Sequence, residues 1–354
     1  MTYPITCVWE ITMACNMRCK HCGSVCKNAL PGELSTEEAL KFVDSCADMG
    51  MVWISISGGE PFTRKDLVQI VKYAVEKGVG INIITNGWLI NEEIAKQLGD
   101  IGGGVRVMIS LEGPEYIHDF IRKKGSFQRS KKSFEILKKY EIESGCITTL
   151  TKQNLAHLDE LKYFLIQNGI GLWQVQLGLP MGSLGKHADW VLDPEQVPDI
   201  IDYCYKVSNE GKIDIFPADC IGYYNDKQDQ IYKNSYHCDN IPTWNGCAAG
   251  IYSFGILHNG DIIGCTSIRD KEYIEGNIKD KSLKEIWENP NSFSWRRKFT
   301  KENLTGDCKK CSYAEKCLGG CPNTRKCMNG TINSENLYCT QNLILKEKFT
   351  KSIL

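Results

Sequence analysis

The sequence lacks the features of a secreted, membrane-bound or nucleic-acid-binding protein. No apolar run reaches the roughly 18 residues that a membrane span needs. The opening MTYPITCVWE has no basic segment followed by a long apolar stretch, so we expect no secretory signal. Acidic and basic residues are interspersed and the formal net charge is −1, which gives no field for a polyanion. We therefore expect a cytoplasmic protein with no nucleic-acid or membrane partner.

Internal repeats and low-complexity segments are also absent, whereas cysteine is abundant. The 354 residues include 18 cysteines. The cytoplasm keeps thiols reduced, and a chain of this length does not need disulfides to fold, so the cysteines indicate metal binding or catalysis. The length also predicts more than one hydrophobic core.

The order of apolar segments predicts a fold in which strands and helices alternate. Up to about residue 230, short apolar runs are separated by amphipathic helical stretches, a pattern typical of parallel strands in a sheet or barrel. We expect strands at residues 5–12, 52–56, 80–85, 105–111, 145–150, 172–177 and 212–216. Beyond residue 232, Gly and Asn turns with closely spaced cysteines predict a second domain over residues 233–342. Residues 343–354 predict a short basic amphipathic helix.

Three cysteines lie in one short loop directly after the first expected strand. Cys15, Cys19 and Cys22 are spaced C-x3-C-x2-C in ITMACNMRCKHCGS. Three thiolates hold three irons of a four-iron cluster and leave the fourth iron open to a substrate or cofactor. A zinc knuckle completed by His21, or three buried thiols, is the alternative. However, His21 stands next to Cys22 and cannot easily face the same metal.

This cysteine loop resembles the signature of the radical S-adenosylmethionine (radical SAM) enzymes. The resemblance implies a partial (β/α)6 barrel of the TIM type over residues 1–232, with S-adenosylmethionine bound to the open iron. Four further segments follow successive strands in the order that the family shows, namely SGGEPF, ITNGW, ISLEGP and HDFIRKKGSF. By resemblance, the cofactor-binding residues are Gly58, Gly59, Glu60, Asn86, Ser110 and Arg122, with His21 beside the adenine.

The C-terminal cysteines resemble the seven-cysteine pattern of the SPASM extension, which occurs in radical SAM enzymes that mature peptides and proteins. The pattern is Cys247-x12-Gly260-x4-Cys265, then Cys308-x2-Cys311-x5-Cys317-x3-Cys321, then Cys339. The resemblance implies two auxiliary clusters, and hence three [4Fe–4S] clusters in all. Auxiliary cluster I is expected on Cys247, Cys265 and Cys321, with Cys238 as its further ligand unless that position stays open for substrate. Auxiliary cluster II is expected on Cys308, Cys311, Cys317 and Cys339. Two zinc ions are the alternative.

The resemblance also implies a reaction, in which S-adenosylmethionine is reductively cleaved and the resulting 5′-deoxyadenosyl radical abstracts hydrogen. We expect a maturase of a ribosomally synthesised peptide that makes a cross-link, a desaturation or a related change. Its expected partners are an electron donor such as flavodoxin or ferredoxin and, because the first strand begins within the opening residues, a separate leader-peptide recognition protein or direct leader docking.

Three other functions stay open. A sulfatase maturase that forms formylglycine carries an Asp where this chain has Thr266. The others are a small-molecule dehydrogenase and a non-enzymatic metal-binding scaffold or electron carrier. The candidate catalytic side chains are Glu112, Asp219, Cys220 and Asp261. Small core positions are expected for Cys7, Cys46, Cys146 and Cys204.

Overall fold

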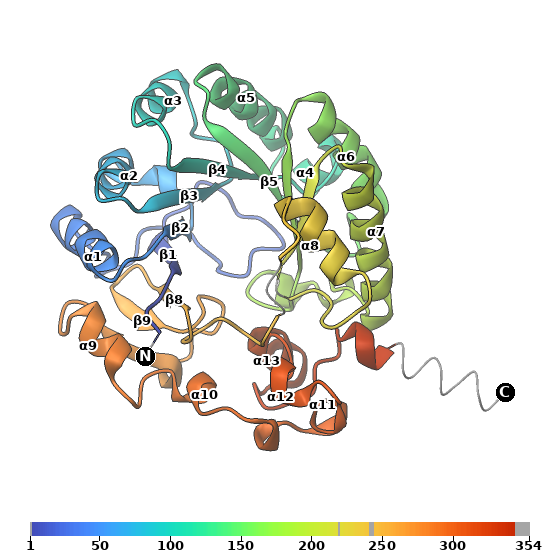
Figure 1. Ribbon diagram of the computed structural model, residues 1–354. Coiled ribbons are helices and arrows are strands. Elements are labelled where there is room, and N and C mark those ends of the chain that lie inside the picture. The colour runs from blue at the N-terminus through green and yellow to red at the C-terminus, as the bar shows by residue number, and fades with distance from the viewer. Residues whose placement is uncertain (1, 219, 241–243, 344–354) are drawn as a thin grey trace. The chain divides into compact units, whose positions relative to one another are not determined.

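The structure is a computed structural model that describes residues 2–218, 220–240 and 244–343 (Figure 1). It divides into two units made of interleaved segments. The first unit comprises Met1–Ser110, His118–Ser144 and Ala248–Lys298, and the second comprises Leu111–Ile117, Gly145–Cys247 and Phe299–Leu354. Residues 248–298, which the sequence suggested for the second domain, therefore pack within the first unit. The division at residue 232 into a cofactor-binding and a cluster-binding domain stays a prediction.

A mostly parallel sheet organises the first unit. Its strands are β1 (Thr6–Thr12), β2 (Trp53–Gly58), β3 (Gly80–Thr85), β4 (Val105–Ser110), β8 (Ser253–Ile256), β9 (Asp261–Ile263) and β10 (Ile274–Asn277). Strands β1 to β4 pair in parallel in chain order, and β8 pairs in parallel with the other side of β1. Strands β9 and β10 continue antiparallel from β8. The carboxyl ends of β1 to β4 share one edge of the sheet, which is where parallel βα folds bind ligands.

Helices follow the parallel strands as the sequence predicts. They are α1 (Thr36–Asp48), α2 (Leu67–Glu76), α3 (Glu92–Gly99), α4 (Glu115–Ile121) and α5 (Ser126–Lys139), with α9 (Leu283–Glu288) and α10 (Ser294–Arg297) after β10. Figure 1 shows α1, α2, α3 and α5 along one side of strands β1 to β4. The predicted capping box begins α1, because the Ser35 side chain accepts from the Glu38 N–H while the Glu38 side chain accepts from the Ser35 N–H.

The second unit has its own parallel strands. Strands β5 (Glu143–Leu150), β6 (Leu172–Leu177) and β7 (Asp214–Pro217) pair in chain order. The helices of this unit are α6 (Leu158–Gln167), α7 (Val197–Glu210), α8 (Gln228–Tyr236), α11 (Gly306–Lys310), α12 (Ala314–Cys317) and α13 (Pro322–Asn329). Parallel strands that alternate with helices in this way confirm the predicted fold class, a partial barrel of the TIM type.

The core of the first unit explains why residues 248–298 belong to it. A chain of aromatic contacts runs through Trp9, Phe42, Phe254, Trp287 and Phe293, with neighbouring ring centroids 5.0 to 6.4 Å apart. All five side chains are at most 2% exposed. Edge-to-face aromatic packing of this kind adds about 1 kcal/mol per pair beyond the buried area. The segment around β8 and α9 is therefore held by the same core as β1 and α1.

The predicted elements differ little from the observed ones. Strands β3 and β6 have the predicted bounds, and the ends of the others differ by at most two residues. The four cysteines expected in the core are buried, as predicted. The C-terminal helix predicted for residues 343–354 falls almost entirely outside the described residues. Within the described part of the chain, no helix combines the length and the apolar character that crossing a membrane requires.

Candidate active site

The cysteine loop of residues 13–35 is closed on itself close to β1. The N–H of Cys15 donates to the Lys27 carbonyl at 3.1 Å, and the N–H of Lys27 donates to the Met13 carbonyl at 3.1 Å. Inside this closed loop the Arg18 guanidinium donates to the Cys15 carbonyl at 2.7 Å and to the Met17 carbonyl. The three thiols of Cys15, Cys19 and Cys22 are partly exposed, so they remain accessible to a cofactor.

The surroundings of Cys22 favour its thiolate, the form that binds metals. The Cys26 thiol and then the N–H groups of residues 24–26 hydrogen bond to the Cys22 sulfur and lower the pKa of Cys22 to about 5. Donors aimed at a ligand sulfur stabilise its negative charge. The donor set of the loop therefore fits an anionic iron–sulfur cluster.

Gly58 and Gly59 bring the end of β2 into backbone contact with the start of the cysteine loop. A Cβ at Gly59 would lie 2.1 Å from the Ala14 carbonyl oxygen, and one at Gly58 would lie 2.3 Å from the Thr12 oxygen. The close approach allows the Gly59 N–H to donate to Thr12 and the Glu60 N–H to donate to Ala14, each at 2.7 Å. No other residue type fits here, because any side chain would overlap the backbone.

Glu60 connects this turn to the end of β3. Its carboxylate is completely buried and accepts from the Thr85 hydroxyl at 2.7 Å, the Asn86 N–H at 2.8 Å and the Phe62 N–H at 3.2 Å. Burial raises the pKa of Glu60, while these donors and the charge of Arg122 act in the opposite direction. The Glu60 carboxylate therefore positions the turn itself, and its contact with the methionine group stays a prediction.

Asn86 connects the end of β3 to the cysteine loop. Its side-chain amide donates to the Asn16 side-chain oxygen at 2.7 Å, and its own side-chain oxygen accepts from the Trp88 N–H at 2.9 Å. The Lys20 N–H donates to the Ile121 carbonyl at 2.9 Å, which ties the same loop to the end of α4, next to Arg122. Three of the four segments that the sequence singled out, SGGEPF, ITNGW and HDFIRKKGSF, thus contact one another or the cysteine loop.

The remaining predicted cofactor residues also lie in the first unit. Ser110 is the last residue of β4, and His21 is 8% exposed within the cysteine loop. Their contacts with S-adenosylmethionine stay predictions. The first unit therefore contains the complete predicted set of cysteines and cofactor residues for the N-terminal site.

The four cysteines predicted for auxiliary cluster II converge on one cavity in the second unit. Cys308, Cys311, Cys317 and Cys339 line it together with Tyr223 and Asn336. Burial, followed by the charges of Cys339 and Cys308, raises the pKa of the Cys317 thiol to about 12. The Asn336 N–H donates to the Cys308 sulfur at 3.3 Å. Four converging thiols with an N–H donor fit a [4Fe–4S] cluster, whose binding would release their protons.

Two glycines between Cys317 and Cys321 make room for large side chains beside this cavity. A Cβ at Gly320 would lie 2.6 Å from the Tyr223 ring, and one at Gly319 would lie 3.0 Å from the Arg325 guanidinium. Both glycines have positive φ, at +71° and +77°. The Tyr223 hydroxyl in turn accepts from the Cys321 N–H at 2.9 Å.

The cysteines predicted for auxiliary cluster I are divided between the units. Cys265 belongs to the first unit, whereas Cys238, Cys247 and Cys321 belong to the second. Cys238 is exposed. This ligand set stays a prediction. The choice between iron–sulfur clusters and the zinc alternatives also stays a prediction.

The candidate catalytic side chains differ in their surroundings. Glu112 is completely buried and accepts from the Thr149 N–H at 2.9 Å, and the Cys220 sulfur accepts from the Leu177 N–H at 3.4 Å. Asp261 accepts from the side chains of Asn259 and Asn277, so it stabilises the turn between β8 and β9. Asp219 lies outside the described residues. A catalytic role for any of them stays a prediction.

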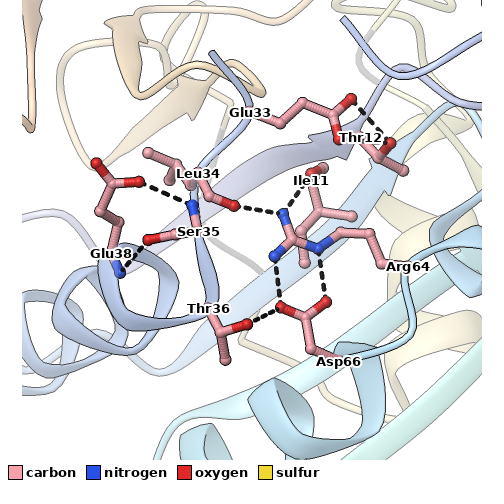
Figure 2. A network of polar contacts seen from close by, with 9 residues as sticks. All are labelled: Ile11, Thr12, Glu33, Leu34, Ser35, Thr36, Glu38, Arg64 and Asp66. Atoms are coloured by element: carbon pink, nitrogen blue, oxygen red, sulfur yellow. Dashed lines mark hydrogen bonds and ion pairs between the residues drawn. The ribbon is translucent and has the colours of Figure 1, made fainter. Parts of the chain in front are cut away.

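Two arginines that the sequence did not single out hold the cysteine loop in place. Figure 2 shows Arg64, which donates to the Ile11 carbonyl at 3.2 Å and the Leu34 carbonyl at 2.9 Å, and which also pairs with Asp66. It thereby joins the two ends of the loop. Arg269 pairs with the buried Glu10 and donates to the Ser24 hydroxyl and the Thr266 carbonyl. It thereby joins the cysteine loop to the segment of Cys265.

Comparison with known proteins agrees with this geometry. The model of the Radical SAM superfamily matches residues 9–165, and the model of the SPASM iron-sulfur cluster-binding domain matches residues 247–312. An AdoMet-dependent heme synthase of Oleidesulfovibrio alaskensis is 30% identical over 348 residues, which cover 94% of this chain and 86% of that protein. This chain belongs to the radical SAM superfamily. The radical SAM enzyme carries a SPASM domain, and its family uses S-adenosylmethionine and iron–sulfur clusters.

Other relatives of this radical SAM enzyme carry different names. The mycofactocin maturase MftC of Mycolicibacterium smegmatis is 29% identical over 333 residues, covering 90% of this chain and 78% of MftC. Streptococcus suis SuiB bound to precursor peptide SuiA has a TM-score of 0.74 at 18% identity, covering 95% of this chain and 75% of SuiB. The enzyme anSMEcpe with bound AdoMet and Cp18Cys peptide has a TM-score of 0.74 at 19% identity, covering 99% of this chain and 98% of anSMEcpe. Both solved structures share the fold of this chain.

Proposed function

We propose that this enzyme modifies a ribosomally synthesised peptide by radical chemistry. In its family, the reduced cluster and S-adenosylmethionine together supply a 5′-deoxyadenosyl radical that abstracts hydrogen from the substrate. The observation that carries the proposal is the closed cysteine loop, which Gly59 and Glu60 connect to the ends of β2 and β3. A carrier of electrons alone has no use for the methionine site that these residues are predicted to form.

Peptide as the substrate class is supported by the relatives. MftC is a maturase similar over 90% of this chain, and two solved structures with this fold contain bound peptides. The auxiliary clusters that we infer would accept the electron left on the product radical, which makes the net reaction an oxidation. An electron donor such as flavodoxin or ferredoxin, a leader-recognition protein and a cytoplasmic location are part of this proposal.

A second candidate is radical modification of an iron porphyrin. Relatives named AdoMet-dependent heme synthase are 29 to 30% identical to this chain over 94% of its length. The formylglycine-forming alternative is less well supported, because Thr266 occupies the position where that group has an Asp.

The test begins with anaerobic reconstitution with iron and sulfide, followed by reduction in the presence of S-adenosylmethionine. Formation of 5′-deoxyadenosine is expected, and it should stop in Cys19→Ala. The matched control is Cys204→Ala, which removes a buried thiol of α7 that belongs to none of the predicted cluster ligand sets. Zinc without iron, or cleavage that persists in Cys19→Ala, would overturn the assignment.

The substrate class is then decided by mass spectrometry of two parallel incubations. One contains short peptides encoded beside the gene, and the other contains Fe-coproporphyrin III. A mass change in a peptide that depends on S-adenosylmethionine supports the proposal. A mass change in the porphyrin that depends on S-adenosylmethionine, with every peptide unchanged, would replace it by the second candidate.

A further inference from the structure

The second unit contains a buried guanidinium in which two of the three nitrogens lack a hydrogen-bond partner among the described residues. Arg325 lies on α13 and is only 2% exposed. Within the described residues, its Nε and Nη1 atoms have no hydrogen-bond partner. Burying an unpaired charge costs several kcal/mol, so buried arginines are normally paired with an anion. The position of Arg325 therefore calls for an anionic partner that the protein side chains do not provide.

The guanidinium lies against the wall of the four-cysteine cavity. Gly319, which lines that cavity, is so close that a Cβ there would lie 3.0 Å from Nη1 and 3.1 Å from Cζ of Arg325. The Phe299 ring packs against the guanidinium, with its centroid 5.2 Å from Cζ. Aromatic packing and the glycine backbone fix the position of the charge without neutralising it.

Most of the groups whose charges act on Arg325 are predicted cluster ligands. Burial lowers the pKa of Arg325, and Cys308, Cys321, Tyr223 and Cys317 act in the opposite direction. Cys308 and Cys317 belong to the predicted set for auxiliary cluster II, and Cys321 belongs to the set for auxiliary cluster I. One cation therefore lies among ligands of both sets.

We propose that Arg325 is the counter-cation of the iron–sulfur cluster in this four-cysteine cavity, and that it raises the reduction potential of that cluster. Four thiolates and the cluster sulfides carry net negative charge, which increases when the cluster is reduced. A fixed buried cation therefore stabilises the reduced form more than the oxidised form. The inference rests on the proposed cluster assignment. Arg325 is a positioning residue for an electron acceptor and does not touch the substrate.

This role of Arg325 follows from the proposed function, in which an auxiliary cluster accepts an electron from the product radical. A product radical gives up its electron more readily when the acceptor has a higher potential. Nearby charges and hydrogen bonds to sulfur are established means by which proteins tune such clusters. Gly319 allows the guanidinium to reach the cavity wall, and Phe299 holds it there.

A redox titration tests the proposal directly. The titration uses chains in which Cys15, Cys19 and Cys22 are all replaced by Ala, so that the auxiliary clusters alone contribute to the electron paramagnetic resonance signal. Arg325→Gln should lower an auxiliary midpoint potential, with a tenfold change in the reduction equilibrium appearing as about 59 mV for one electron. Arg325→Lys keeps the charge and should restore part of the shift. Lys326→Gln, one residue further along α13, removes an equal charge and should leave the potential unchanged.

The outcomes distinguish a failure of the inference about Arg325 from a failure of the cluster assignment. Unchanged potentials in Arg325→Gln at full iron content would overturn the inference alone. A wild-type chain that binds only about four irons, the content of a single four-iron cluster, would overturn the cluster assignment and the inference with it.

A second measurement applies even if Arg325→Gln fails to assemble the cluster. In iron-free protein, Arg325→Met removes an unpaired buried charge and fills the same space, so the thermal midpoint should rise. In reconstituted protein, the same substitution should lower the amount of bound iron. A lower thermal midpoint for iron-free Arg325→Met would show that the guanidinium is already satisfied and would overturn the proposal.

Discussion

Arg64 and Asp66 form an ion pair with two contacts, at 2.9 Å between Nε and Oδ1 and at 2.6 Å between Nη2 and Oδ2. The pair is largely buried, with side chains 9% and 20% exposed. The remaining Arg64 nitrogen donates to carbonyls at both ends of the cysteine loop, while Asp66 accepts from the Thr36 hydroxyl at 2.7 Å (Figure 2). One arginine thus ties the end of β1, the end of the loop and the beginning of α1 together.

Replacing Arg64 by Gln should therefore destabilise the first unit. The substitution leaves the Asp66 carboxylate and two carbonyls without their donor, and breaking a buried pair typically costs about 3 kcal/mol or more. Anaerobic denaturant unfolding measures the change. The control is Lys72→Gln, which breaks the exposed pair with Glu76 and should cost less than about 0.5 kcal/mol. Equal unfolding midpoints for the two variants would contradict the role given to Arg64.

The sequence allowed us to predict interactions between residues that are close together in the chain. It did not allow us to predict interactions between residues that are far apart. The cysteine loop and the capping box at Ser35 were predictable because their residues interact with near neighbours. The contact of Arg269 with Glu10 joins residues 259 positions apart. No local pattern marks such a pair, because it depends on β8 returning to pair with β1.

Arg325 illustrates a different limit. It stands four residues after Cys321 at the start of a helix, and that spacing alone is also typical of an ordinary surface arginine. What distinguishes Arg325 is that it is buried while its Nε and Nη1 have no hydrogen-bond partner in the described part of the chain, which only the packed structure shows. Similarly, the pattern SGGEPF marks a turn, but the contact of Gly59 with Ala14 explains why the turn has to contain glycine.

A Cβ at Gly59 should disrupt the connection between the turn and the cysteine loop. Gly59→Ala places a methyl group 2.1 Å from the Ala14 oxygen, so the backbone has to move. A displacement near 1 Å at a catalytic site costs roughly 10²-fold in rate. The assay is 5′-deoxyadenosine formation at full iron content. Gly103→Ala is the matched control, because a Cβ there meets nothing within 4 Å, and its rate should stay near that of the wild type. A normal rate in Gly59→Ala would show that the loop tolerates the displacement.

Glu10 should make the stability of the protein depend on pH. Burial raises its pKa to about 7, the Arg269 charge lowers it, and the Cys22 charge raises it further. Because the folded state holds the proton more tightly than the unfolded state, this contribution is fully present below pH 4.5 and is lost as the pH rises through about 7. The loss amounts to about 3 kcal/mol at most.

Unfolding free energies between pH 5 and pH 8, measured for the wild type and Glu10→Gln, test this dependence. The Glu10→Gln curve should be flatter, because the variant has no carboxyl to deprotonate. Glu37→Gln on the exposed face of α1 is the control, and its curve should run parallel to that of the wild type. Parallel curves for Glu10→Gln and the wild type would remove Glu10 as the cause.

Removing ligands from the four-cysteine cavity should remove one cluster and leave the others. If each cluster holds four irons, reconstituted wild-type protein contains about twelve irons per chain, and the double variant Cys308→Ala with Cys339→Ala should contain about eight. Both thiols line the same cavity, so their loss leaves two ligands, which is too few to hold a cubane. Cys204→Ala removes a thiol that is 1% exposed in α7 and should retain the full iron content.

Formation of 5′-deoxyadenosine should persist in the double variant, because the N-terminal cysteines are untouched. Iron content that stays at the wild-type value in the double variant would mean that the cavity holds no cluster.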